Sequence, residues 1–506
     1  MTSIAVAAPH PAAVDAARTV IGAGGGVIDA ALAAAAALTV AYPHQCSIGG
    51  DLVALVRSGD GEVRTVMSSG AAAGAVDVDA LRAAGERMPP GGAQTVTVPG
   101  VVAGWAALAA QGARLSLAEI LAPAIELARD GVPVSPGLAR ALRARLEVVR
   151  ADPGLSALML DAWAEPRPTG AVLYQPALAT TLETLAADWS SYYTGPLAER
   201  LVSALNGFGS PLTTADFAAH RADLTPPLTL DVNGVQWSVA PPPHQGVSLL
   251  SVLRNRTAGA AGTLRAARSA EQRRDALLGD PRTGPVDVEA LLGVGPLPSP
   301  TLPTGPKPTG DTVAVSVVDD QGRAVSLIQS VFQSFGSGLL DPATGVVFHN
   351  RGSTFSLDPA HPGRLHPGSR PPHTLCPAIG VGPDVVVALG CQGGRAQPWI
   401  LAQLVDEVIS AGDSDDLAAL LARPRWVIGS RGLGRPGPTL LLEPGVSNLD
   451  PLTETAIELG LAVAEADGPI DDAGHVQVAR SGPGGTAAAS DPRADGRAEI
   501  VTAESG

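Results

Sequence analysis

Apolar residues recur along the first third of the chain in two patterns, one with helical spacing and one in short continuous runs. The helical spacing predicts a helix over residues 27–40, and the short runs predict strands over 52–57 and 63–67. Apolar positions at helical spacing, bounded by proline and glycine, predict packed helices over 115–129 and 136–149. The order of these elements indicates a mixed α and β architecture.

The clearest local pattern is a hairpin that begins at Thr312. Two strand-like runs are joined by a turn sequence, and a three-residue loop with Gly322 in the left-handed conformation would pair Asp319 with Arg323. Seven residues further from the turn on each side, Ser330 then lies opposite Thr312, with Cβ atoms about 5 Å apart on one face. The register therefore predicts two adjacent hydroxyl groups.

The segment before this hairpin has a different composition. Arginine-rich helical sequence begins near residue 259 and gives way to a stretch dense in proline and glycine over 293–310. Such a stretch supports neither a helix nor a strand ladder, so we expect it to be exposed and mobile. It ends at Asp311, directly before the hairpin.

Cleavage between Asp311 and Thr312 would change the chemistry of the threonine. An internal threonine hydroxyl is inert, because nothing nearby accepts its proton. An N-terminal threonine carries an α-amino group with a pKa of about 7.7 to 8.0, which can serve as the general base for its own hydroxyl. The same hydroxyl can make the cut by attacking the Asp311 carbonyl, which gives an ester that water hydrolyses.

An amide-cleaving site also needs donors for the developing oxyanion. Gly393 and Gly394 follow an apolar strand predicted over residues 385–389, and their backbone N–H groups could face that charge. Taken alone, a glycine pair after a strand is more often an ordinary turn.

Composition and charge narrow the class of protein. The chain has 506 residues, 45% of them apolar and 16% charged, which is typical of a folded protein with one large layered α/β unit or several domains. The net charge of −15 disfavours nucleic-acid and anionic membrane partners. The apolar stretch over 30–40 is too short to span a bilayer.

The N-terminus lacks the pattern of a secretory signal, so we expect a cytoplasmic protein. Three widely spaced cysteines predict neither a disulfide framework nor a metal site, and Cys391 is interpreted as a small buried residue. The glycines over 22–26 lack the full spacing of a dinucleotide loop and are interpreted as the end of a helix. The histidines of one region match no metal-ligand motif, so we expect no metal and no cofactor; they are His349, His361, His366 and His373.

Short motifs over nearly the whole chain follow the order found in one enzyme family. Before the hairpin they lie at 8–12, 25–31, 47–51, 98–105 and 241–246. From the hairpin on, they lie at 310–312, 334–338, 350–356, 373–374, 393–394 and 490–493. By these motifs the chain resembles the γ-glutamyltransferase superfamily of N-terminal-nucleophile hydrolases.

The resemblance implies an α+β fold of four αββα layers. It also implies autoproteolysis before Thr312 into a large α subunit, residues 1–311, and a small β subunit, residues 312–506, which stay together as a heterodimer. In this scheme Thr312 is the nucleophile, Ser330 supports its amine, and Gly393 and Gly394 form the oxyanion hole.

The chain departs from the γ-glutamyl-binding members at the residues that would hold the substrate. Those members bind the α-carboxylate with an arginine near the position of Ser68, and the α-amine with an aspartate pair where this chain has Ser353 and Thr354. A serine pair is replaced by His373 and Thr374. The loss of charge-assisted bonds, about 1.5 to 3 kcal/mol each, makes glutathione a poor candidate substrate.

The remaining features resemble the branch that includes oxamate amidohydrolase and the cephalosporin acylases. The predicted substrate is a small non-γ-glutamyl amide. The residues predicted to bind it are Asn350, Ser353, Thr354, His373 and Thr374. Two alternatives stay open: a true γ-glutamyltransferase or glutathione hydrolase, and a family member that never matures and has a binding role.

Overall fold

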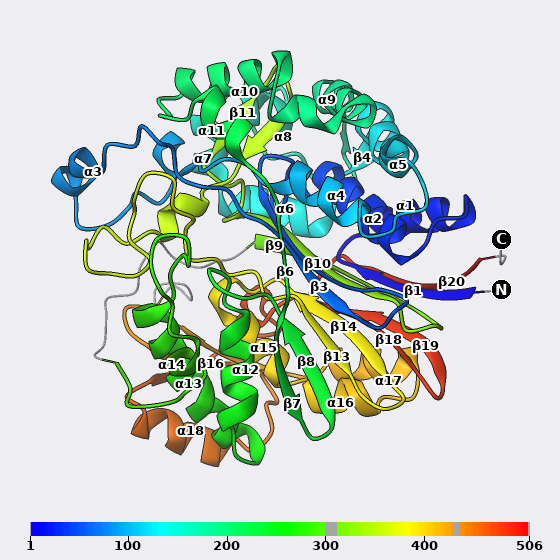
Figure 1. Cartoon of the computed structure of the whole chain (residues 1–506), viewed down its shortest axis with the longest axis vertical. Helices are drawn as coiled ribbons and strands as arrows, with labels where there is room; N and C mark the ends of the chain where they lie inside the picture. The colour runs from blue at the N-terminus through cyan, green and yellow to red at the C-terminus, as the bar shows by residue number, and fades with distance from the viewer. Residues whose placement is uncertain (1, 299–310, 430–434, 504–506) are drawn as a thin grey trace.

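Two antiparallel sheets form the centre of the computed structural model, which describes residues 2–298, 311–429 and 435–503 (Figure 1). The first sheet has seven strands in the order β20 (Arg497–Ala503), β1 (Thr2–Ala8), β9 (Asp311–Asp319), β10 (Ala324–Phe332), β2 (Asp51–Arg57), β3 (Val63–Ser68) and β6 (Asp223–Thr225). The second has six strands in the order β19 (Gly485–Ser490), β18 (Val476–Gly482), β14 (Val386–Cys391), β13 (Ala378–Val381), β8 (Val235–Val239) and β7 (Leu228–Val232).

Helices lie on the outer side of each sheet, some of them directly on its strands and others packed on those helices (Figure 1). On the first sheet they are α1 (Pro11–Gly22), α2 (Val27–Ala41), α4 (Val101–Ala109), α5 (Leu117–Asp130), α6 (Pro136–Ala144), α7 (Leu146–Ala151), α8 (Pro153–Met159), α9 (Pro176–Ala187), α10 (Pro196–Gly207) and α11 (Thr214–Ala219). On the second they are α12 (Gly246–Asn255), α13 (Gly259–Leu277), α15 (Gln397–Ala402), α16 (Val405–Ser410), α17 (Ser414–Leu421) and α18 (Leu449–Glu458). This is the predicted αββα arrangement.

Smaller elements complete the described chain. Three short sheets join β15 (Trp426–Gly429), β16 (Thr439–Leu442) and β17 (Ala462–Glu465), β11 (Leu339–Asp341) and β12 (Val346–Phe348), and β4 (Val132–Pro133) and β5 (Val172–Leu173). The other α-helices are α3 (Val78–Ala84) and α14 (Val288–Leu291), and short 3-10 helices include Arg351–Thr354 and Gly394–Ala396. Most of the proline-rich segment that follows α14 lies outside the described residues.

Successive side chains of β9 point to opposite faces of the first sheet, so every second one faces the space between the two sheets. Val313, Val315 and Val317 pack into the core beneath α2, whereas the even-numbered residues point to the second sheet. Ser316 Oγ accordingly donates to the carbonyl oxygen of Gln477 in β18, at 3.0 Å. Thr312 is on the same face of the strand, so its hydroxyl belongs to the interior of the sandwich.

Most of the predicted elements are present, and one is different. The helix predicted over 136–149 is interrupted at Arg145, whose φ of −118° ends α6 before α7 begins. The apolar spacing continues across this break, and neither glycine nor proline marks it in the sequence. Residues 22–26 form the turn between α1 and α2, as predicted, with Gly24 at φ 98°.

The motif at 490–493 has a structural role. Arg493 donates from Nε to Glu443 (2.7 Å) and from Nη1 to Asp491 (3.0 Å), and Arg425 also pairs with Asp491. All four side chains are buried. This cluster ties β19 to β16 and the segment before β15.

Within the described ranges, no helix is both long enough and apolar enough to cross a bilayer. The three cysteines are buried free thiols, and burial raises the pKa of Cys391 well above its ordinary value. Since the thiolate is the reactive form, Cys391 is an inert residue of the core, as predicted.

Candidate active site

The β9–β10 hairpin has the predicted register. Strand pairing runs from Ala324 opposite Val318 to Gln329 opposite Val313, and the Asp319 N–H donates to the Arg323 carbonyl at 3.0 Å. Gly322 has the left-handed φ of 75° that the three-residue loop requires.

The two predicted hydroxyl groups are in contact. Thr312 Oγ1 donates to Ser330 Oγ at 3.0 Å, and Ser330 Oγ also accepts the Phe332 N–H at 2.8 Å. The pairing shifts by one residue between Gln329 and Phe332, and Phe332 has a φ of 79°. A bulge of this kind re-aims side chains and is common beside active sites.

Both hydroxyl groups are buried in the intact chain. Thr312 and Ser330 are each 1% exposed. The α-nitrogen of Thr312 is still part of a peptide bond, so it has no lone pair that could take the hydroxyl proton. In the intact chain the Thr312 hydroxyl therefore has neither solvent access nor an amine of its own as base.

The glycine pair lies where β14 ends. Gly393 has a φ of 143° and Gly394 a φ of 51°, values that other residues rarely adopt. A Cβ atom on Gly393 would lie 2.6 Å from Ile400 Cδ1, so the isoleucine side chain would also have to move to admit any other residue. Gln245 Nε2 donates to the carbonyl oxygens of Gly394 (2.8 Å) and Thr374 (2.5 Å) and thereby joins the glycine pair to the 373–374 segment.

The predicted substrate-binding residues divide into two groups. Asn350 and Ser353 stabilise their own loop, because Asn350 Nδ2 donates to Gln333 Oε1 (3.0 Å) and Ser353 Oγ donates to the Asn350 carbonyl (2.7 Å). Thr354 donates to the Pro372 carbonyl at 2.9 Å and lines a pocket.

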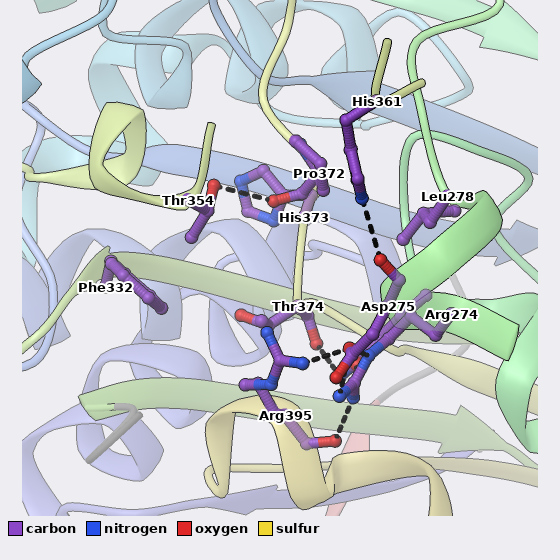
Figure 2. Close-up of a pocket in the computed structure, with 11 residues that line it drawn as sticks. Arg274, Asp275, Leu278, Phe332, Thr354, His361, Pro372, His373, Thr374 and Arg395 are labelled. Atoms are coloured by element: carbon purple, nitrogen blue, oxygen red, sulfur yellow. Dashed lines mark hydrogen bonds and ion pairs between the residues drawn. The ribbon is translucent and has the colours of Figure 1, made fainter. Parts of the chain in front are cut away.

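Figure 2 shows this pocket, which has a volume of about 30 Å³. It brings together three of the five predicted binding residues with side chains from α13 and from the glycine loop. Its lining residues are Gln245, Arg274, Asp275, Leu278, Phe332, Thr354, His361, Pro372, His373, Thr374 and Arg395. Thr312 is not one of these lining residues.

His373 is held by a buried carboxylate. Its Nε2 lies 3.1 Å from Asp51 Oδ2, and its Nδ1 accepts the Leu375 N–H at 3.4 Å. This bonding fits a neutral ring with the proton on Nε2, and burial lowers the pKa of His373 to about 3. Burial alone would raise the pKa of Asp51, but His349 and His373 outweigh it and hold the pKa below its ordinary value.

The histidines of this region have separate roles. His361 Nε2 lies 2.8 Å from the Asp275 carbonyl, and His366 Nδ1 lies 2.8 Å from the Pro367 carbonyl. His349 lies 3.4 Å from Asp51 and 2.9 Å from the Thr97 carbonyl. His349 and His373 thus share the Asp51 carboxylate, whereas His361 and His366 each contact a different backbone carbonyl.

Two arginines and one aspartate form the charged side of the pocket (Figure 2). Arg274 donates to Asp275 at 3.0 Å and to the Arg395 carbonyl at 2.8 Å, and the Arg395 guanidinium pairs with Asp275. Burial would raise the pKa of Asp275, but the two cations lower it. The cluster is therefore ionised and carries one net positive charge.

Arg351 and Gln245 are site residues that the sequence alone did not single out. Arg351 is fully buried, its guanidinium carbon lies 4.1 Å from the Phe332 ring centre, and its Nη1 donates to Thr374 Oγ1 at 3.0 Å. Burial lowers the pKa of Arg351 to about 9, so the group is a cation at neutral pH. In the sequence, the only indication of a role for Gln245 and Arg351 is that they belong to the family motifs at 241–246 and 350–356.

Comparisons with known proteins agree with this geometry. The family model described as gamma-glutamyltranspeptidase matches residues 13–501. The chain belongs to the γ-glutamyltranspeptidase family. Its members named below are amide hydrolases, which makes this chain an amide hydrolase or acyltransferase and confirms the predicted family.

Relatives of several kinds are similar over most of their length. An oxamate amidohydrolase proenzyme of Klebsiella pneumoniae is 41% identical over 86% of this chain and 87% of its own. A glutathione hydrolase-like proenzyme of Bacillus subtilis, YwrD, is 33% identical over 84% and 85%. The crystal structure of a cephalosporin acylase from Bacillus halodurans superimposes with a TM-score of 0.85 at 30% identity, covering 100% of this chain and 96% of that one.

Proposed function

We propose that this γ-glutamyltranspeptidase family member cleaves its own Asp311–Thr312 bond and then hydrolyses a small non-γ-glutamyl amide with Thr312 as nucleophile. The observation that carries the proposal is the 3.0 Å hydrogen bond between the Thr312 and Ser330 hydroxyls at the hairpin bulge. The relatives named as proenzymes support cleavage of the precursor.

Maturation proceeds in two steps. Thr312 Oγ1 attacks the Asp311 carbonyl carbon, and the Thr312 nitrogen leaves as an amine, so that an ester replaces the peptide bond. Water then hydrolyses the ester, which gives the Asp311 carboxylate and a free hydroxyl beside a free amine on Thr312.

Substrate hydrolysis repeats this chemistry on another amide. Thr312 Oγ1 attacks the substrate carbonyl, its α-amine accepts the hydroxyl proton, and that proton passes to the departing nitrogen. The N–H groups of Gly393 and Gly394 stabilise the oxyanion, and Ser330 positions the amine. Water hydrolyses the acyl ester and restores the enzyme.

The two fragments would stay associated as a heterodimer of residues 1–311 and 312–506. In the first sheet, β1 of the large fragment pairs with β9 and β20 of the small one, and β10 pairs with β2. In the second sheet β13 of the small fragment pairs with β8 of the large one, and separation would break all four ladders. We also propose a cytoplasmic location, which the three free thiols support.

A substrate comparison tests the proposed specificity. The positions opposite a γ-glutamyl amine hold Ser353 and Thr354, which carry no charge, and the described pocket has a net positive charge. We expect the purified mature protein to release ammonia from oxamate and to cleave γ-glutamyl-p-nitroanilide at least about tenfold less efficiently. Rapid turnover of the anilide without oxamate hydrolysis would instead indicate a glutathione hydrolase, which the name of the Bacillus subtilis relative makes the second candidate.

The pH profile of kcat/KM is expected to have one limb in the neutral range. The Thr312 amine must be unprotonated to act as base, so activity should fall about tenfold per pH unit below its pKa, about 7.7 to 8.0 in water. The pKa of His373 is lowered to about 3, so this ring contributes no second limb between pH 5 and 9. A rate independent of pH from 5 to 9 would argue against the amine as base.

A further inference from the structure

Arg351 is a buried cation whose hydrogen-bonding capacity is only partly used. Its side chain is 0% exposed, and its Nε and Nη2 atoms have no hydrogen-bond partner among the described residues. No carboxylate of the described chain lies within ion-pair distance of it, since Asp51 acts on it only at longer range. A buried guanidinium in this state is costly unless a ligand completes it.

The two free N–H atoms lie on the same edge of the guanidinium. Nη1 is occupied by Thr374 Oγ1, which leaves the edge formed by Nε and Nη2. On this edge the two N–H bonds are parallel and spaced to match the two oxygens of one carboxylate. The hydrogen bond to Thr374 and the cation–π contact with the Phe332 ring, 4.1 Å from the guanidinium carbon to the ring centre, both restrain the group.

Arg351 lies next to the reaction centre of the proposed mechanism. Phe332 and Thr374, its two contacts, both line the pocket in Figure 2. Phe332 N–H donates to Ser330 Oγ, the hydroxyl that accepts from Thr312. Thr374 is linked through Gln245 to Gly394. Only a few bonds of substrate could therefore separate the scissile carbonyl from a group held by Arg351.

The charges around the site favour an anion. Arg274 and Arg395 both pair with Asp275, and Asp51 is bonded to His373. Counting Arg351, three cations face two carboxylates. One negative charge on the substrate would balance this set.

We propose that Arg351 binds a carboxylate on the acyl part of the substrate through its Nε and Nη2 edge. The substrates would then be short amides whose acyl group carries a second, ionised carboxyl group close to the scissile carbonyl. This inference rests on the proposed function for the reaction itself. It adds which acyl groups are accepted and which residue selects them.

Two substrates that differ at one group test the selection. Oxamate and oxamide share the scissile amide, but oxamide has a neutral amide in place of the carboxylate. In Arg351→Gln we expect kcat/KM for oxamate to fall about 10- to 100-fold, mainly through KM, with a change of less than about threefold for oxamide. Arg351→Lys keeps the positive charge but loses the two parallel N–H donors, so the decrease in kcat/KM for oxamate should be intermediate.

The matched control is Arg480→Gln. Arg480 is also a buried arginine whose Nε has no partner among the described residues. It lies in β18 and donates to the carbonyl oxygens of Ile409 and Ala411 at the end of α16. Its loss should not change the preference for oxamate over oxamide. A denaturing gel establishes that each variant has matured before it is assayed.

Binding of oxalate, the product of oxamate hydrolysis, gives a readout that does not require turnover. Calorimetric titration should show oxalate binding to mature wild type and Arg480→Gln, and binding at least about tenfold weaker to Arg351→Gln. If wild type hydrolyses no amide but binds oxalate through Arg351, the binding site stands and the proposed function fails. Equal losses on oxamate and oxamide, or oxalate binding unchanged in Arg351→Gln, would overturn the carboxylate role.

Discussion

A Thr312→Ala variant is expected to remain one chain of 506 residues and to lose amide hydrolysis. Without the hydroxyl nothing can attack the Asp311 carbonyl, and no free amine is formed to act as base. Wild type should run on a denaturing gel as fragments of 311 and 195 residues, which together make up the 506. We expect turnover of oxamate in the variant to fall by roughly 10⁴-fold or more.

Thr312→Ser is the matched control for this experiment. It keeps the hydroxyl and, after cleavage, the amine, so it should mature and retain measurable activity. Ser330→Ala removes the partner that receives the 3.0 Å hydrogen bond from Thr312 and should slow maturation without preventing it. N-terminal sequencing of the small fragment must begin at Thr312. A wild-type protein that stays intact after purification would favour the alternative of a binding protein that never matures.

The hairpin could be predicted from the sequence because every rule that fixes it is local. The loop type at Gly322 sets the register, and the period of two then places Thr312 and Ser330 on one face. The structure agrees from Ala324 to Gln329 and departs only at the bulge before Phe332. No residue type in the sequence marks that bulge.

The rest of the site could not be predicted in the same way, because its contacts join distant parts of the chain. Asp51 and His373 are 322 residues apart, and Gln245 reaches Gly394 across 149 residues. Arg351 begins a single turn of 3-10 helix, Arg351–Thr354, and an arginine is usually exposed. Here it is buried, and its contacts include Phe332 and Thr374 from two other segments. Local patterns contain no information about such contacts.

Replacement of Gly393 by alanine is expected to lower kcat about 10²- to 10³-fold, the usual effect of removing an oxyanion-hole donor. The backbone at φ 143° is unfavourable for alanine, and the new Cβ would lie 2.6 Å from Ile400 Cδ1. The peptide must therefore shift, and the N–H groups of Gly393 and Gly394 would no longer face the developing charge. Stopped assays on the matured fraction, measured by gel, separate this effect from slow maturation.

Two further variants separate the causes of that loss. Gly485→Ala places alanine at a φ of 95° in the first residue of β19, where a Cβ meets nothing within 4 Å, and should change kcat less than about twofold. Ile400→Val removes the Cδ1 atom, so adding it to Gly393→Ala should relieve the clash and recover part of the rate while the backbone strain remains. Full activity in Gly393→Ala alone would mean that the oxyanion is stabilised by other donors, because the displaced glycine amides could not have done so.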